Sequence, residues 1–73
     1  MPKLRILSAA EVCGILQKHG FIRSRQSGSH IVMRKQTADG GRTVIVQNHS
    51  EIRRGTLKSI IDQSGLSRSL FMN

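Results

Sequence analysis

The segment FIRSRQSGSHIVMRKQTADGGRTVIV, residues 21–46, carries the pattern that decides the fold. Phe21 to Arg25 and Ser29 to Lys35 read as strands, and the three-residue connection Gln26-Ser27-Gly28 suits a hairpin. Residues 37–41 are rich in turn-forming side chains, and Arg42 to Val46 is a third strand by its β-branched content. Because short connections join successive strands, the segment predicts a three-stranded antiparallel meander.

A helical pattern precedes this meander. Ser8 and Glu11 stand in the Ser-x-x-Glu spacing of a capping box. Apolar residues then recur at helical spacing until Gly20, which we expect to close the helix. One of these apolar residues is Cys13, the only cysteine of the chain, so we expect a buried core position rather than a nucleophile or metal ligand.

A second helical pattern follows the meander after a polar, irregular stretch over residues 47–55. Thr56 is the expected N-cap of this helix and Gly65 its end, while Ser67 is expected to cap a last short turn. The order α-β-β-β-α leaves two helical stripes to cover one face of the sheet. The prediction is an α+β two-layer sandwich that forms a single domain over residues 1–73.

The chain is strongly basic. Twelve Lys and Arg residues face four Asp and Glu residues, which gives a formal net charge of +8 and a pI near 11.6. Nucleic acid is the partner that this balance favours, although an anionic membrane surface and an acidic protein are also compatible with it. No apolar run approaches the roughly 20 residues of a membrane span, and no signal-peptide core follows Met1, so we expect a cytoplasmic protein without membrane contact.

His30 follows a Gly28-Ser29 turn at the start of the second predicted strand. Neutral imidazole can accept the 2′-hydroxyl proton of a ribose near physiological pH, so His30 is the candidate catalytic residue for RNA cleavage. It alternates with Val32 and Arg34 on one strand face, and periodicity alone does not tell which face is buried. The alternative is a structural histidine whose ring is satisfied by a backbone carbonyl at the sheet edge.

Cleavage of RNA through its own 2′-hydroxyl needs a base, a phosphate clamp and a proton donor for the departing oxygen, and in principle needs no metal. Gly28 and Ser29 allow a ligand to approach the backbone closely, and Ser29 can donate a hydrogen bond. The sequence does not identify the proton donor. The candidate phosphate ligands of the meander are Arg23, Arg25, Arg34, Lys35 and Arg42.

A second group of candidates surrounds the start of the second predicted helix. Arg53, Arg54 and Lys58 flank it, and the backbone N–H groups of Gly55, Thr56 and Leu57 are positioned to bind a phosphate there. The alternative is a solvated basic face. His49 is a possible second site residue, or else a turn or capping residue.

Metal and cofactor binding are not expected. The three histidines, His19 among them, are spaced too widely for a compact ligand motif, and no cysteine pair or acid cluster accompanies them. His19 falls in the last turn of the first predicted helix, where a cation suits the helix dipole, and we assign it no function.

Several of these features together resemble the HicA family of small bacterial toxins, over about Ser8 to Phe71. The resemblance rests on the run Arg25-Gln26-Ser27-Gly28-Ser29-His30-Ile31-Val32-Met33-Arg34, followed by His49, Gly55-Thr56-Leu57, Ile60-Ile61, Gln63 and Gly65-Leu66-Ser67. It implies a fold like that of a double-stranded-RNA-binding domain, an mRNA-cleaving activity that halts translation, and neutralisation by a HicB-type antitoxin.

By motif match the family's catalytic histidine falls on His30 and its glycine on Gly28. Two features differ from the family pattern. Val46-Gln47-Asn48-His49 lacks the proline of the second family motif, and no aromatic residue follows His30 closely. These differences bear on the path of the loop that carries His49 and on base preference.

Three functions follow as hypotheses. The first is a metal-independent endoribonuclease toxin, monomeric when alone and hetero-oligomeric with its antitoxin, which would cover His30 and so switch the activity off. The second is a noncatalytic RNA- or DNA-binding module of the same fold. The third is a basic interaction protein whose only partner is an acidic protein.

Overall fold

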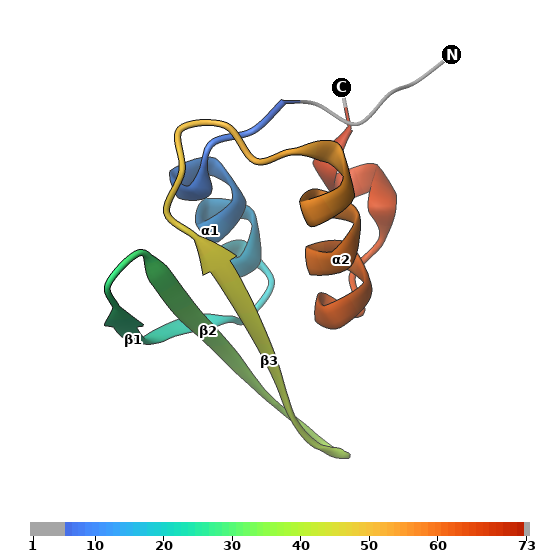
Figure 1. Cartoon of the computed structure of the whole chain (residues 1–73). Helices are drawn as coiled ribbons and strands as arrows, with labels where there is room; N and C mark the ends of the chain where they lie inside the picture. Colours follow the sequence, from blue (N-terminus) through green and yellow to red (C-terminus); the bar gives the residue numbers. More distant parts are fainter. Residues whose placement is uncertain (1–5, 73) are drawn as a thin grey trace.

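The computed structural model describes residues 6–72 and confirms the predicted order of elements (Figure 1). Two helices cover one face of a three-stranded antiparallel sheet, as an α+β two-layer sandwich requires. The elements are α1 (Ala9–Lys18), β1 (Ile22–Ser27), β2 (His30–Thr37), β3 (Gly40–Gln47), α2 (Arg54–Ser64) and the short 3₁₀ helix η1 (Arg68–Phe71).

Both predicted ends of α1 are confirmed. The backbone N–H of Glu11 donates to the Ser8 hydroxyl at 3.1 Å, and the Ser8 N–H donates to the Glu11 carboxylate at 3.1 Å. At the other end, Gly20 takes a φ of 96° and the N–H of Phe21 donates to the Leu16 carbonyl at 3.0 Å. This is a Schellman closure, which turns the chain directly into β1.

The sheet has the order β1-β2-β3, so β2 is the central strand. The first hairpin differs from the prediction, because Ser27 pairs with His30 and only Gly28 and Ser29 form the turn. The ladder continues to the turn because a two-residue connection matches the twist of paired strands, which lengthens β1 by two residues beyond its predicted end. A bulge between Arg23 and Arg25 interrupts the pairing of β1 with β2.

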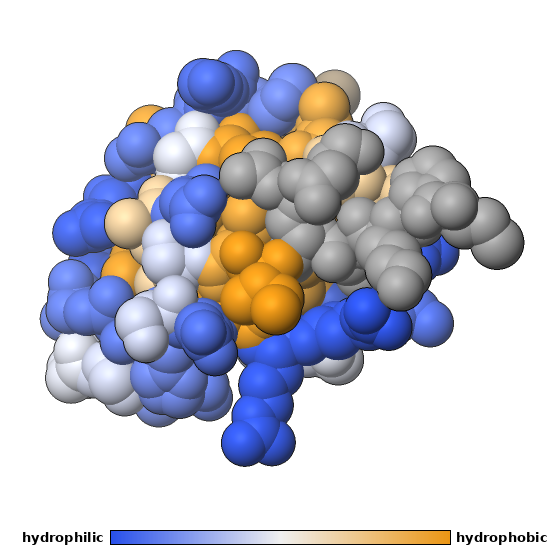
Figure 2. Space-filling view, turned by 90° about the horizontal axis from the view of Figure 1, so that it is seen from above, coloured by the Kyte–Doolittle hydropathy of each residue, from blue (hydrophilic) through white to orange (hydrophobic). Residues whose placement is uncertain are grey.

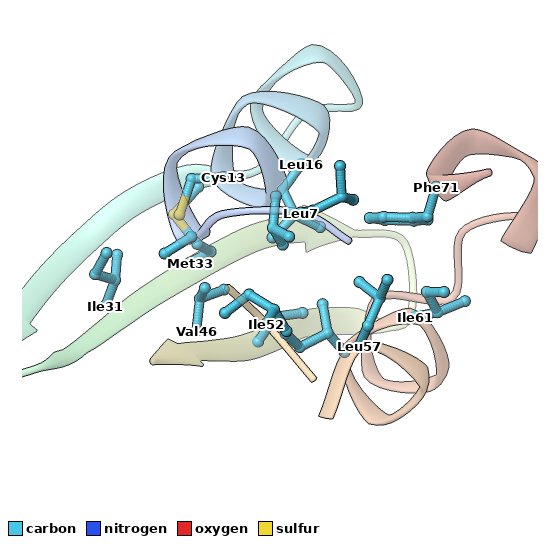
Figure 3. Close-up of a cluster of buried hydrophobic side chains, with 14 of the residues drawn as sticks. Leu7, Cys13, Leu16, Ile31, Met33, Val46, Ile52, Leu57, Ile61 and Phe71 are labelled. Atoms are coloured by element: carbon cyan, nitrogen blue, oxygen red, sulfur yellow. The ribbon is translucent and has the colours of Figure 1, made fainter. Parts of the chain in front are cut away.

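The core lies between the sheet and the two helices (Figure 3). Ile31 and Met33 of β2 and Val44 and Val46 of β3 are buried on the face that the helices cover. The core also takes up both aromatic residues of the chain and the cysteine: Phe21, Phe71 and Cys13. The sequence period did not tell which face of this strand is buried. Because the odd-numbered residues of β2 are buried, its even-numbered residues, His30 among them, lie on the open face.

The start of α2 was predicted wrongly. The helix begins at Arg54, and its N-cap is Arg53, whose side chain makes no capping hydrogen bond, rather than Thr56. The Leu57 N–H already donates to the Arg53 carbonyl at 2.8 Å, and Leu57 is completely buried. Burial of the apolar stripe therefore outweighs the capping preference of threonine. The predicted end at Gly65 is confirmed by a φ of 71°.

The last predicted turn is also confirmed as η1, with the Ser67 hydroxyl accepting from the Ser69 N–H at 3.3 Å. No helix within residues 6–72 combines the length and the apolar character needed to cross a bilayer.

Candidate nucleic-acid interface

His30 is the first residue of the central strand, and its side chain lies on the sheet face that the helices leave uncovered. Ser27 of β1 stands opposite it on one side and Gln47 of β3 on the other. Opposite residues of neighbouring strands project to the same face, so the imidazole lies in a row between a hydroxyl and an amide side chain.

The imidazole is free to receive a ligand. His30 is exposed, and no residue between 6 and 72 forms a hydrogen bond or ion pair with its side chain. The alternative interpretation, a histidine held by a backbone carbonyl at a sheet edge, is not what the structure shows. The ring stands at the end of a central strand without a partner among the described residues.

The turn beside His30 is built by its glycine. Gly28 has a φ of 59° and Ser29 does not have a positive φ, which is the pattern of a type II′ hairpin turn. A Cβ on Gly28 would meet no atom within 4 Å, so the backbone conformation rather than crowding requires glycine. The Ser29 carbonyl accepts from the Asn48 N–H at 2.6 Å, which fixes the turn to the segment after β3.

The five cations of the meander do not form one cluster around His30. Arg25 pairs with Val32 and Arg34 with Thr43, so these two share the open face with His30. Arg25 is the diagonal neighbour of His30, at a separation that long side chains reach. Arg34 extends the other way, since its Nη2 lies 3.4 Å from the position that a Cβ on Gly41 would take.

The other three cations project to the side of the sheet that carries the helices, because Arg23 pairs with Met33 and Lys35 with Arg42. Each has a structural neighbour there. Lys35 Nζ is 5.9 Å from the ring centroid of Phe21, and Arg42 Nη1 donates to the Gln63 carbonyl at 3.4 Å. Arg42 therefore places a positive charge at the C-terminal end of α2, where the helix dipole favours it.

Arg23 is the neighbour of Cys13. Burial raises the pKa of the Cys13 thiol, and the nearby Arg23 guanidinium opposes this rise only in part. A buried thiol that stays protonated is a poor nucleophile, which agrees with the predicted core role of Cys13.

The basic group at the start of α2 is exposed, as expected for Arg53, Arg54 and Lys58. The prediction that the N–H groups of Gly55, Thr56 and Leu57 are available to a phosphate needs correction. Because α2 starts earlier than predicted, the Leu57 N–H already donates to the Arg53 carbonyl. The N–H groups of the first helical turn belong instead to Arg54, Gly55 and Thr56.

His49 lies between β3 and α2. Its carbonyl accepts from the Ala9 N–H at 2.9 Å, so its backbone helps to hold the start of α1. Its exposed side chain lines a pocket together with Glu51, Ile52 and Arg53. Ser27, Gln47 and Glu51 were not predicted from the sequence. Two-residue turns at the ends of both hairpins would have paired Ser27 and Gln47 with His30.

No group of three metal-ligating side chains occurs in residues 6–72.

The comparison with protein families agrees with the resemblance in the sequence. The model of the family described as the HicA toxin of bacterial toxin–antitoxin systems matches residues 9–66 of the 73. The chain belongs to the HicA toxin family. It is therefore a toxin of a toxin–antitoxin system, and its family implies an antitoxin partner. No curated protein matches the chain.

Gly28 of this HicA toxin has a positive φ, so a substitution there is expected to affect stability. We expect Gly28→Ala to lower the free energy of unfolding by about 1–2 kcal/mol, because an alanine strains the backbone at positive φ. Urea unfolding followed by circular dichroism measures the change. Gly55→Ala is the matched control, since Gly55 lies in α2 without a positive φ and a Cβ there meets nothing within 4 Å. An equal loss of stability in both variants would contradict this account of Gly28.

Proposed function

We propose that this HicA toxin is a metal-independent endoribonuclease that cleaves mRNA, with His30 as the general acid/base. The single observation that carries the proposal is the position of His30: an exposed imidazole without a partner among the described residues, at the end of the central strand of a strongly basic domain.

In the proposed reaction His30 removes the proton from a ribose 2′-hydroxyl. The 2′-oxygen then bonds to the adjacent phosphorus, and the bond from phosphorus to the 5′-oxygen breaks. The 5′-oxygen takes a proton from water, and the protonated His30 returns its proton to the hydroxide that remains. The other product ends in a 2′,3′-cyclic phosphate. Arg25 is the cation best placed to stabilise the charge that develops on the phosphate, because it is diagonal to His30 on the same face.

Ser27 and Gln47 flank the imidazole on the open face. Their hydroxyl and amide groups are donors available to phosphate oxygens. Arg34 and the cations at the start of α2 add longer-range attraction for the RNA backbone. Arg23, Lys35 and Arg42 contribute to the net charge, but their side chains have other neighbours.

We expect His30→Ala to reduce RNA cleavage by at least ~100-fold, because general acid–base catalysis contributes about 10²–10⁴-fold. RNA binding and folding are expected to persist. A defined single-stranded RNA is incubated with each protein in excess EDTA, and the new 3′ ends are analysed for cyclic phosphate. His19→Ala serves as the control that removes a histidine from the end of α1.

Two results would contradict the proposal. Cleavage retained by a clean His30→Ala preparation would exclude His30. RNA binding by the wild type without any cleavage would favour the noncatalytic module, and failure to bind RNA at low salt would favour a purely protein-binding role.

Arg25 lies on the open face of the sheet and Arg42 at the end of α2. Alanine substitutions at these two positions remove the same charge but are expected to have different effects. Arg25→Ala is expected to reduce cleavage by about tenfold or more while stability is preserved, because Arg25 is an exposed phosphate ligand. Arg42→Ala is expected to lower the free energy of unfolding by about 1 kcal/mol, because it removes a charge from the end of α2. Cleavage rates and urea unfolding are measured for both. Equal losses of cleavage at unchanged stability would show that the two arginines act alike.

We further propose that a HicB-type antitoxin binds the open face of the sheet and covers His30. The face offers apolar as well as basic contacts, since Ile22 is 68% exposed and Ile45 50% exposed. Acidic groups of the antitoxin would face Arg25 and Arg34. Occlusion of the imidazole then stops cleavage.

We expect Ile45→Ser to weaken antitoxin binding by about five- to tenfold, because a half-exposed isoleucine contributes on the order of 1 kcal/mol when an interface buries it. Leu70→Ser is the control, since Leu70 is exposed on η1 instead of the sheet. Affinities are measured by isothermal titration calorimetry with the antitoxin. Antitoxin that binds the wild type without reducing cleavage would contradict occlusion.

A further inference from the structure

The segment between β3 and α2 surrounds two adjoining hollows. The larger, about 550 Å³, is lined by Ile6, His49, Glu51, Ile52, Arg53 and Arg54. The smaller, about 260 Å³, is lined by Gln47, His49, Glu51, Ile52, Arg53 and Thr56. Because four lining residues are common to both, we treat them as one site, the loop pocket. Figure 2 looks down on this end of the molecule and shows an apolar patch bordered by hydrophilic side chains.

The walls of the loop pocket are held by three backbone hydrogen bonds, one to the first hairpin turn and two to the start of α1. The Asn48 N–H donates to the Ser29 carbonyl at 2.6 Å, the Ala9 N–H to the His49 carbonyl at 2.9 Å, and the Ile52 N–H to the Leu7 carbonyl at 2.7 Å. A segment fixed at three points keeps its shape before a ligand arrives. Such preorganisation lowers the entropy cost of binding.

The loop pocket adjoins the proposed catalytic histidine through Gln47. This residue stands opposite His30 across β2 and β3, and it also lines the smaller hollow. Gln47 therefore links the surface around His30 to the loop pocket.

The unusual group in this pocket is Glu51. It is one of four acidic residues in a chain of net charge +8. Although Arg53 and Arg54 line the same pocket, no residue in the described part of the chain forms an ion pair with Glu51. A carboxylate repels phosphate, so on an RNA-binding surface it suits a different part of the nucleotide, namely the N–H donors of a base.

Guanine fits this carboxylate best among the four bases. Its Watson–Crick edge carries N1–H and N2–H side by side, which matches the two oxygens of one carboxylate, whereas the other bases offer no such pair of adjacent donors. Bases of single-stranded RNA are also held by stacking on histidine rings or arginine planes. His49 supplies such a ring on the same pocket, in a chain whose two phenylalanines are both buried.

We propose that the loop pocket binds an unpaired guanine next to the scissile phosphate, with Glu51 accepting hydrogen bonds from the base and His49 stacking on it. The role in cleavage rests on the proposed ribonuclease function. Binding of the base itself is measurable without cleavage, so the two proposals can fail separately.

The first experiment compares cleavage of RNA oligonucleotides that differ only in the base on either side of one cleavable bond. We expect the wild type to cleave at guanine at least tenfold faster than at adenine in one of these positions. Glu51→Gln should bring this ratio close to one, because an amide replaces one acceptor oxygen with a donor. Asp62→Asn is the matched control, since it removes the same charge from an exposed site on α2 and should leave the ratio unchanged.

The second experiment titrates ¹⁵N-labelled protein with guanosine, adenosine and uridine 5′-monophosphates and follows the amide resonances. Guanosine monophosphate is expected to shift the signals of Glu51, Ile52 and Arg53, and Glu51→Gln to abolish these shifts. Guanine binding without RNA cleavage would uphold the pocket and overturn the ribonuclease function. Cleavage that depends on His30, with neither a guanine preference nor such shifts, would overturn the pocket alone.

Discussion

Burial of one face of the sheet under two helices is the constraint on which the rest of the structure depends. Ile31 and Met33 point into the core from the central strand, and side chains alternate along a strand. A slip of one residue would bury His30 and expose Met33, so the hydrophobic pattern fixes the register strongly. The exposure of the imidazole is therefore a consequence of core formation, and no separate feature is needed to keep it at the surface.

The same alternation of side chains along the strands places the positive charges of the meander on two different faces of the sheet. Arg25 and Arg34 share the open face with His30, while Arg23, Lys35 and Arg42 lie on the side of the helices. Arg42 illustrates the second group, because its guanidinium reaches the Gln63 carbonyl and would lie 2.7 Å from a Cβ at Gly65. A net charge of +8 thus overstates the number of cations that can contact one phosphate group, although all of them attract RNA over longer distances.

Two hydrogen bonds connect the elements around His30 into one unit. The bond from the Asn48 N–H to the Ser29 carbonyl joins the first turn to the segment after β3, and the bond from the Ala9 N–H to the His49 carbonyl joins that segment to α1. The catalytic histidine that we propose, the loop pocket and the N-terminus of the first helix are consequently held in a fixed relation. This arrangement suits a small domain whose substrate lies on its surface rather than in a deep cleft.

The sequence by itself determined the order of elements, the capping box of α1 and the glycine ends of both helices, because these depend on contacts within a few residues. It also named His30 as a candidate. It placed the N-cap of α2 at Thr56, an error that concerns a long-range relation, and it did not tell which of the five meander cations share a face with His30. Only the tertiary structure decided which face of the sheet the helices cover and which distant residues lie beside His30. It also decided the start of α2, which begins at Arg54 with Leu57 buried. Strand pairing and burial join residues far apart in the chain, so local patterns do not contain that information.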